Sequence, residues 1–547
     1  MFIEKLSRFL KAKRTRKDIF LLSLLVVVLL WQPFYLHQEL NLFEWGLYLP
    51  GIDAVAQGQV PFRDFFHLRG PFELYAPALF MKIFGFRADV LASYFYFGTV
   101  LTIIAAMLIA YEIIQQRFLL YSLMPILVTR TFPRVVFTFW GGMRYAWGLL
   151  AVWCLIRFFK TKRPGWLVAG GCLAAIGAWT SIEIGAIVVS AFIVALFLNR
   201  EHLRSAWIFL SGFLIISLPY GIYLLIQHAW IPYLQSQWMV VAHMGGVFLQ
   251  IEPIPDTFSK FLHAIFFPLD KSFYQMTPMY SYMFFFFFYS WRMFKKRITA
   301  LEQAALIVAV YGLILFLTSF RNLWASEFEM SLQPEKIILF YLLGQLIAGA
   351  EEKFARFKWV PTALLIAVII SSAIYSIGRF KTRFYKASWA YQMIPQKSQG
   401  KDTLVNGSSP SPIDLPRISH MTIPLWQAQD LEQLTRFVDE HVPAHETVWM
   451  YPELGSLHFI LHRPWVGHFP VATLSWLSED WFADYEIELQ QNPPRYAIVN
   501  KKMPFYFDDY FLVPANRIKH ERMMQFLYDH YVIESQTPTY FIYRRTH

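Results

Sequence analysis

Long apolar runs separated by short clusters of basic residues make up the first two thirds of the chain. A helix needs about 20 apolar residues to cross the hydrocarbon core of a bilayer, and fewer where neighbouring helices shield its ends. By this criterion the pattern predicts about eleven transmembrane helices. They are expected over residues 19–36, 90–115, 118–130, 144–159, 166–180, 182–198, 205–227, 279–291, 298–319, 336–350 and 359–378. Two of these runs are short, so a tilted or partly re-entrant helix is an alternative for each of them.

The pattern changes after about residue 379, where charged residues, Pro and Ser become more frequent and a linker-like run covers 396–416. We therefore expect a membrane domain over residues 1–379 and a C-terminal soluble domain over residues 380–547. The periodicity of the apolar positions in this second domain predicts a small α/β fold. Its expected helices are 430–441, 486–491 and 523–530, and its expected strands are 446–451, 496–500 and 540–543.

Composition supports a membrane protein. Of the 547 residues, 56% are hydrophobic, 18% are aromatic and only 16% are charged, which is too few charges to cover a soluble globule of this size. The formal net charge is +11, but the basic residues cluster between apolar runs, as they do where cytoplasmic loops set topology. Because no basic face or binding motif accompanies them, we expect no nucleic-acid partner. Cys154 and Cys172 lie inside apolar runs and indicate no disulfide framework.

The distribution of basic residues predicts the topology. The first apolar run is too long for a signal peptide, and residues 31–35 offer no small-residue cleavage site, so we expect an uncleaved span. Threading the spans alternately places the basic segments on the side of the basic N-terminus, as the positive-inside rule requires. These segments are Arg117 and residues 157–163, 200–204, 292–297 and 353–358. We therefore expect a cytoplasmic N-terminus and a C-terminal domain on the outer face.

The outward segments are then residues 37–89, 131–143, 228–278 and 321–335 and the C-terminal domain. Glu44 opens the first of these loops, a few residues past the first span. Residues 47–57 have helical apolar spacing, which predicts an amphipathic helix lying along the membrane interface. Such a helix would hold Glu44 near the lipid headgroups. The alternative is that Glu44 accepts hydrogen bonds at the start of a helix, where the dipole favours an acid.

The first loop also carries an ordered set of short motifs. Glu44 begins an acid-x-Gly-Leu-Tyr element, and residues 58–65 read Gly-x-Val-Pro-x-Arg-Asp-Phe. Gly70-Pro71, with Tyr75, Leu79 and Phe84-Gly85, follows. This order resembles the first outward loop of bacterial C-type glycosyltransferases, the superfamily of protein O-mannosyltransferases and aminoarabinose transferases.

Two later regions are similar to the same superfamily. Residues 166–185 resemble its Gly-rich span followed by a Lys-x-Glu-x-Gly element, with Ser181 in place of the Lys. Residues 437–443 and 459–464 are similar to the outward C-terminal domain of its bacterial members. The resemblance implies a GT-C-like polytopic α-helical membrane fold with a C-terminal soluble α/β domain.

The resemblance also implies a function and two central residues. It implies an inverting transferase that moves a sugar from a polyprenyl-phosphate donor to a lipid, glycan or protein acceptor on the outer face of the bacterial cytoplasmic membrane. Glu44 would be the general base that takes the proton of the acceptor hydroxyl. Arg69, where the family commonly has a Lys, would bind the donor phosphate with its planar fork of donors.

Further basic residues lie in and next to the second outward loop, which contains no acid where many family members have one. Arg130, Arg134 and Arg144 either neutralise the lipid phosphate or anchor the ends of helices in the headgroups. A requirement for a divalent metal stays open, and Glu44 and Asp64 are the ligands that we would assign to it.

The remaining candidates are supporting residues. Asp64 next to Arg63 is expected to position the loop through hydrogen bonds. Glu183 lies at the junction of two apolar runs, where a carboxylate is costly unless it is paired or functional, and we expect it to pair with an Arg. Arg321 and Glu327 in the last outward loop are expected to contact donor or acceptor.

Two other classes of protein remain as alternatives. A transporter or flippase of a lipid-linked saccharide would carry charged residues inside its spans and inverted repeats, and the sequence shows few of the former and no repeat. A non-catalytic membrane scaffold would use the soluble domain to bind partners. The sequence carries no signal of an oligomeric state.

Overall fold

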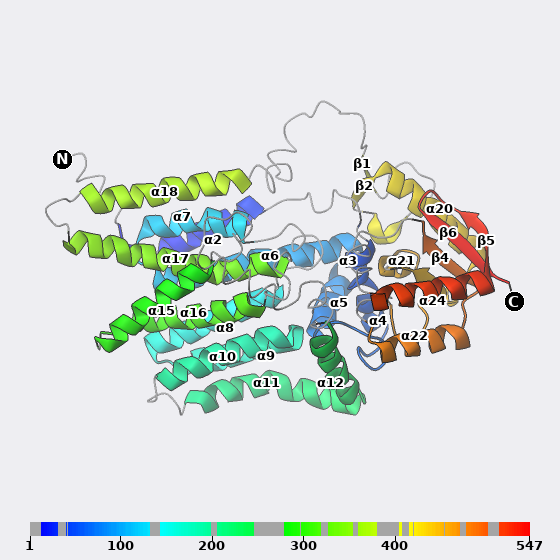
Figure 1. Cartoon of the computed structure of the whole chain (residues 1–547), viewed down its shortest axis with the longest axis horizontal. Coiled ribbons are helices and arrows are strands. Elements are labelled where there is room, and N and C mark those ends of the chain that lie inside the picture. The colour runs from blue at the N-terminus through cyan, green and yellow to red at the C-terminus, as the bar shows by residue number, and fades with distance from the viewer. Residues whose placement is uncertain are drawn as a thin grey trace. The chain divides into compact units, whose positions relative to one another are not determined.

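A computed structural model of the chain describes most of its residues. The described residues are 12–30, 40, 42–131, 143–198, 205–244, 278–295, 297–318, 326–353, 359–379, 404–406, 415–419, 421–452, 454–470, 477–501 and 514–546. The chain divides into two compact units, and each brings together segments that are distant in the sequence (Figure 1). The first unit contains residues 1–33, 95–219 and 255–395, and the second contains 34–94, 220–254 and 396–547. The second unit therefore includes the first outward loop as well as the C-terminal residues.

The first unit is built from apolar helices, and two of them, α6 and α11, continue into the second unit. The helices are α2 (Arg16–Leu30), α6 (Ala88–Ile113), α7 (Arg117–Arg130), α8 (Met143–Thr161), α9 (Gly165–Thr180), α10 (Ile182–Leu198), α11 (Ser205–Ile226), α15 (Pro278–Phe294), α16 (Ala300–Thr318), α17 (Ser326–Lys353) and α18 (Trp359–Arg379). Each predicted span overlaps one of them, and residues 31–36 of the first predicted span lie outside the described residues. Among the described residues, 4 helices are long and apolar enough to cross a membrane, namely α6, α11, α16 and α18.

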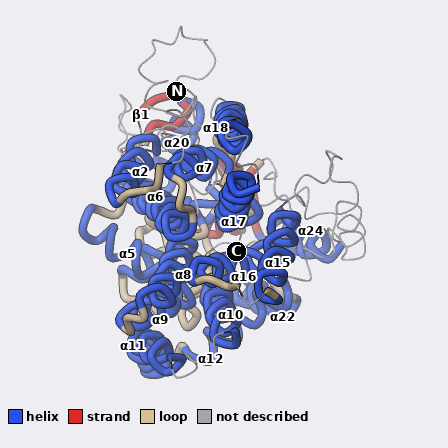
Figure 2. Tube along the Cα trace, turned by 90° about the vertical axis from the view of Figure 1, so that its left-hand side faces the viewer, coloured by secondary structure: helices blue, strands red, loops and turns tan. Residues whose placement is uncertain are grey.

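The helices of the first unit run alongside one another and are seen end-on in Figure 2. Helix α8 packs against α9, α10 and α16, and α7 packs against α17 and α18. Glycines allow the closest approaches. A Cβ atom at Gly171 of α9 would overlap the backbone at Phe209 of α11, and one at Gly212 of α11 would overlap the backbone at Val168 of α9. Small residues facing each other in this way let membrane helices pack backbone to backbone.

The predicted outward loop at 321–335 is wrong over residues 326–335, which are helical. Helix α17 already begins at Ser326, and it continues through Pro334 to Lys353. Glu335 is only 1% exposed; the Ser281 hydroxyl donates to its carboxylate, and Lys336 pairs with it at 2.8 Å. These polar residues lower the hydropathy of the first turns of α17, so the pattern of apolar residues places the start of the helix too late.

The C-terminal part of the second unit is a four-stranded mixed sheet with helices, which confirms the α/β prediction (Figure 1). The strands lie in the order β3 (Val448–Tyr451), β4 (Tyr496–Asn500), β6 (Tyr540–Arg545), β5 (Tyr531–Gln536), with β3 and β4 parallel and the other pairs antiparallel. Its helices are α20 (Leu425–His441), α21 (Gly455–Ile460), α22 (Glu479–Gln491) and α24 (Pro514–His530). A short antiparallel pair, β1 (Leu404–Asn406) and β2 (Thr422–Pro424), and the 3₁₀ turn η9 (Pro416–Ile418) precede α20.

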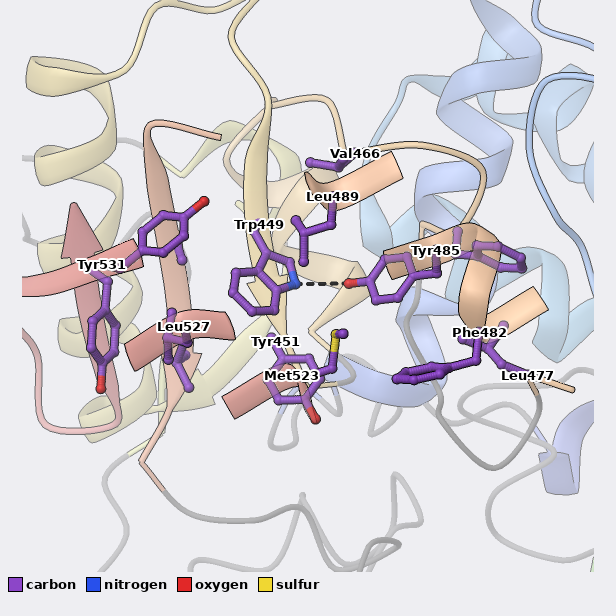
Figure 3. Close-up of a cluster of buried hydrophobic side chains, with 14 residues drawn as sticks. Trp449, Tyr451, Val466, Leu477, Phe482, Tyr485, Leu489, Met523, Leu527 and Tyr531 are labelled. Atoms are coloured by element: carbon purple, nitrogen blue, oxygen red, sulfur yellow. Dashed lines mark hydrogen bonds between the residues drawn. The ribbon is translucent and has the colours of Figure 1, made fainter. Parts of the chain in front are cut away.

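An aromatic core joins the sheet to α22 and α24 (Figure 3). At its centre the Trp449 indole donates to the Tyr485 hydroxyl at 2.8 Å, which satisfies both polar atoms in the interior. Phe66 of the first outward loop packs against this core, with its ring centroid 4.9 Å from that of Trp481 and 5.6 Å from that of Phe469. The C-terminal core is therefore completed by a residue from the start of the chain.

Apart from the ends of α6 and α11, the other described helices of the second unit are short. They are α3 (Leu42–Gly46), α4 (Leu49–Ala56), α5 (Phe72–Phe84), α12 (Trp230–Met239) and the π-helical turn η4 (Val240–Met244). The expected helix at 47–57 is present as α4, but the prediction that it lies along the membrane interface is wrong. Leu49, Ile52 and Ala54 are buried, and α4 packs against α5 and α21. Protein, rather than lipid, covers its apolar side.

Candidate functional site

Glu44 lies in α3 and is only 2% exposed. Helix α3 is held against α21 at very short range, because a Cβ at Gly46 would lie 2.8 Å from the Ser456 backbone nitrogen. The Ser456 hydroxyl also donates to the Leu42 carbonyl at 2.5 Å. The structure therefore fixes the backbone on both sides of Glu44 through a helix that lies more than four hundred residues later in the chain.

Two further contacts tie the start of the loop to the C-terminal residues. The Gln427 side chain accepts from the Leu40 amide at 2.8 Å and donates to the Leu40 carbonyl at 2.9 Å. Arg417 donates to Asp53 of α4 at 2.7 Å. Buried hydrogen bonds of this kind are expensive to leave unmade, so they hold the loop in one conformation.

The middle of the loop is held by His468. Its Nε2 lies 2.8 Å from the Arg63 carbonyl, and the Phe66 amide donates to the His468 carbonyl at 2.7 Å. Glu488 accepts from the His468 amide at 2.9 Å. The hydrogen bond between the His468 side chain and Glu488 raises the pKa of His468. His468 therefore stays protonated to a higher pH than a histidine in water.

Arg69 lies in a compact polar cluster. Its Nη1 donates to the Tyr48 hydroxyl at 2.6 Å and lies 3.4 Å from the Glu73 carboxylate. His67 is 5% exposed, and its Nε2 lies 3.9 Å from the same carboxylate. Burial, and then the positive charge of Arg69, lower the pKa of His67 to about 3, so it is neutral at physiological pH. The cluster thus combines a charged guanidinium with a neutral imidazole in a largely buried loop.

Asp64 and Arg63 form a paired structure at the tip of the loop. Arg63 donates from Nε and Nη2 to the two Asp64 oxygens at 2.7 and 2.8 Å, and Asp64 also accepts from the Val60 amide at 2.7 Å. The hydrogen bond from Arg63 lowers the pKa of Asp64. Arg63 Nη1 lies 3.1 Å from the Gln227 side-chain oxygen. This geometry supports the expected positioning role of Asp64.

No group of three or more His, Cys, Asp or Glu residues in the described part of the chain is arranged to hold a metal ion. Both Asp64 oxygens accept hydrogen bonds from the protein, from Arg63 and from the Val60 amide. The assignment of Glu44 and Asp64 to a metal therefore stays a prediction.

The other predicted site residues lie in the first unit or outside the described residues. Arg144 of α8 is 6% exposed, donates to the Tyr145 hydroxyl at 2.8 Å and lies 4.6 Å from the centre of that ring. Glu183 lies half-buried in the first turn of α10. Arg130 ends α7 and Glu327 lies in the first turn of α17, and only their backbone is described. Arg134 and Arg321 lie outside the described residues.

The first unit contains a polar cavity of about 490 Å³ at the ends of α6, α15, α16 and α17. Its lining includes Lys13, Gln116, Arg292, Glu302 and Tyr341. Arg292 donates to Glu302 at 2.6 Å, so these two charges in the lining are paired. None of the predicted site residues lines this cavity.

The sequence prediction missed Tyr48, His67 and Glu73, which complete the Arg69 cluster. A local signal for two of them was available, because Tyr48 follows Glu44 by four residues and Glu73 follows Arg69 by four, the spacing of helical neighbours. Gln427, Ser456 and His468 were missed as well, and no local signal marks them, since their partners lie hundreds of residues away.

No family model matches the sequence, and no curated protein matches it either. Solved structures do match. ArnT from Cupriavidus metallidurans in the apo state is 13% identical with a TM-score of 0.52, over 96% of this chain and 96% of that chain. ArnT bound to undecaprenyl phosphate is 11% identical with a TM-score of 0.50, over 96% and 97%. The Archaeoglobus fulgidus oligosaccharyltransferase tethered with an acceptor peptide is 12% identical with a TM-score of 0.51, over 97% and 74%.

These similarities extend over nearly the whole chain. Because the identity is low, they establish the fold alone. The chain is a polytopic α-helical membrane protein with the GT-C fold and a C-terminal α/β domain, as the sequence resemblance implied.

Proposed function

We propose that the chain is an inverting glycosyltransferase that moves a sugar from a polyprenyl-phosphate donor to a lipid, glycan or protein acceptor on the outer face of the bacterial cytoplasmic membrane. The observation that carries this proposal is the match over 96% of this chain and 97% of ArnT in a structure that holds undecaprenyl phosphate. The second unit supports it, because it contains a carboxylate and an arginine in one loop that the C-terminal domain holds in place.

The proposed reaction is a single displacement. The acceptor hydroxyl oxygen attacks the anomeric carbon of the donor sugar, and the hydroxyl proton passes to the Glu44 carboxylate. The bond between the anomeric carbon and the phosphate oxygen breaks, and polyprenyl phosphate leaves with the electron pair. The configuration at the anomeric carbon inverts. The close packing of α3 against α21 would hold the Glu44 carboxylate in position for this transfer, so the loop need not rearrange.

Arg69 would stabilise the negative charge that develops on the departing phosphate. Tyr48 and Glu73 orient its guanidinium, so the positive charge is held in place before the donor binds. We propose Arg130, Arg134 and Arg144 as further cations for the donor phosphate. Supporting roles in the loops and spans are proposed for Arg63, Asp64, Glu183, Arg321 and Glu327.

The test is turnover by the purified protein in lipid nanodiscs, with a polyprenyl-phosphate sugar as donor and a membrane extract as acceptor. Released polyprenyl phosphate is measured. Loss of a general base costs about 10²- to 10⁴-fold in rate, and Glu44→Gln is expected to fall in this range. Glu521→Gln is the matched control, because that side chain is 60% exposed on α24.

Two results would contradict the proposal at different levels. Equal turnover of Glu44→Gln and Glu521→Gln would show that Glu44 is not the base. Failure to consume a lipid-linked sugar with any acceptor would remove the enzyme assignment itself.

Arg69→Ala tests phosphate binding in the same assay. A hydrogen bond to a charged group contributes about 1.5–3 kcal/mol, so KM for the donor should rise roughly 10- to 100-fold. Tyr48→Phe removes only the hydroxyl that orients Arg69 and should raise KM less. Arg517→Ala, at an arginine that is 71% exposed, is the control. Unchanged kcat and unchanged KM for the donor in Arg69→Ala would contradict any role of Arg69 at the phosphate, and a loss of kcat with unchanged KM would restrict that role to the charge that develops in the transition state.

A further inference from the structure

Helix α12 exposes its apolar side, whereas a helix on the surface of a water-soluble protein buries that side. Its exposed side carries large apolar residues: Ile231 is 60% exposed, Leu234 44% and Trp238 73%. Val241, in the η4 turn that continues it, is 63% exposed. The spacing of three, four and three residues places these side chains in one stripe.

Two polar residues of α12 face the protein instead, while Gln235 is exposed. Ser236 is 4% exposed and Gln237 is 7% exposed, and Tyr233 lies buried beside them. In water the favourable arrangement is the reverse, with apolar residues buried and polar residues solvated. An exposed apolar stripe of this length marks a surface that is covered in the native environment.

The chain itself indicates what covers the stripe. Helix α11 is one of the helices long and apolar enough to cross a membrane, and its last turns expose Leu218, Ile222 and Leu225. Only residues 227–229 separate its end from α12, with His228 in the left-handed region at φ 55°. Helix α12 therefore starts where a membrane span ends. The exposed apolar residues near the end of α11 are thus followed along the chain by the exposed stripe of α12.

We propose that α12 is an interfacial helix whose stripe, Ile231, Leu234, Trp238 and Val241, lies in the headgroup and acyl boundary of the leaflet in which α11 ends. Its Trp suits this position, since indole rings favour the boundary between headgroups and hydrocarbon. The partner is the lipid surface itself.

The buried side of α12 contacts the first outward loop. The Tyr233 ring lies edge-on to Phe62 at 5.1 Å, and the Ser236 hydroxyl lies 3.5 Å from the His67 carbonyl. The helix thus connects the bilayer surface to residues 62–67, which lead directly into Arg69. Anchoring in lipid would fix the height of this loop above the hydrocarbon core.

Site-directed spin labelling tests the proposal without any assay of activity, so its outcome is independent of the glycosyltransferase proposal. Cys154 and Cys172 are first replaced by Ala, and single cysteines are then placed at Leu234, Trp238 or Gln59. The nitroxide-labelled proteins are reconstituted in phosphatidylethanolamine and phosphatidylglycerol vesicles. Collision with oxygen, which partitions into lipid, is compared with collision with a water-soluble nickel chelate.

At Leu234→Cys and Trp238→Cys the ratio of oxygen to nickel collisions should be several-fold higher than at Gln59→Cys. Gln59 is the control because it is exposed in the first loop of the same unit. Nickel accessibility equal to that at Gln59 would place the stripe in water and overturn the proposal. Exclusion of both reagents would overturn it too, because it would show that protein, either this chain or a second copy, covers the stripe.

Discussion

At the scale of single residues, the loop that carries Arg69 depends on a histidine that must stay neutral. His67 is 5% exposed beside Arg69, and its pKa is lowered to about 3. In the unfolded chain the same side chain takes up a proton below about pH 6.5. In the folded chain His67 stays unprotonated until the pH falls close to its lowered pKa. Stability contributed by the neutral His67 is therefore complete above about pH 6.5 and is lost as the pH falls.

His67→Phe tests this linkage. The variant keeps a ring of similar size but has no group to protonate, so it should lose less stability on acidification than the wild-type protein. For one proton the difference should reach about 2 kcal/mol at pH 5 relative to pH 7. Apparent Tm in detergent between pH 7.5 and 5 measures it. His530→Gln, at an exposed histidine of α24, is the control variant. Parallel curves for His67→Phe and the wild type would refute the buried neutral state.

At the scale of elements, the position of Glu44 depends on how closely α3 approaches α21. Gly46→Ala adds a Cβ that would lie 2.8 Å from the Ser456 nitrogen and 2.9 Å from the Gly455 Cα, so one helix must move. Overpacking of this kind typically costs 1–3 kcal/mol, and we expect a loss of about that size, seen as a lower Tm. Turnover should fall as well, because the displaced helix carries Glu44.

Gly349→Ala is the matched control for that experiment. Nothing lies within 4 Å of a Cβ built at Gly349 in α17, so the substitution should be neutral or stabilise the helix by up to about 1 kcal/mol. If Gly46→Ala and Gly349→Ala have the same Tm and turnover, the close contact between α3 and α21 does not hold the loop.

Much of the fold could be predicted at this scale, because it depends on local pattern. The transmembrane helices follow from runs of apolar residues, and strand β4 coincides with the expected 496–500. Strand β5 was missed, since four of its six residues, including Val532 and Ile533, are exposed and show no alternation. The expected interfacial helix was placed at 47–57 because spacing alone does not tell whether protein or lipid covers an apolar face. In α4 the cover is α5 and α21, whereas α12 leaves its stripe exposed.

The candidate site could be predicted only in part, for a related reason. Glu44, Arg63, Asp64 and Arg69 were found from local motifs in the first loop. The residues that hold the loop, such as Gln427 and Ser456, are separated from their partners by 387 and 414 positions. Such pairs arise only when the chain folds, and one sequence contains no periodicity that would reveal them.

At the scale of the whole molecule, the second unit restricts how the chain can cross the membrane. It gathers residues 34–94, 220–254 and 396–547 into one compact body, so all three segments must lie on the same side. Each intervening stretch must then cross the bilayer an even number of times or not at all. The described helices α6 to α11 and α15 to α18 satisfy this condition if each crosses once, and the basic clusters fall on the opposite side.

Labelling with a membrane-impermeant maleimide in intact cells tests this arrangement. In a background without Cys154 and Cys172, single cysteines at Gln59, Gln235 and His530 represent the three segments. All three should react with the maleimide added outside the cells. If lipid protects Gln235→Cys alone, adding detergent should make it react. Lys162→Cys, between α8 and α9, should react only after the cells are opened, as the basic cluster around it predicts an inner position. Reaction of Gln59 and His530 on opposite sides of the membrane would be incompatible with one folded unit. Reaction of both only from inside would keep the unit but reverse the predicted topology, and with it the outer-face site for Glu44.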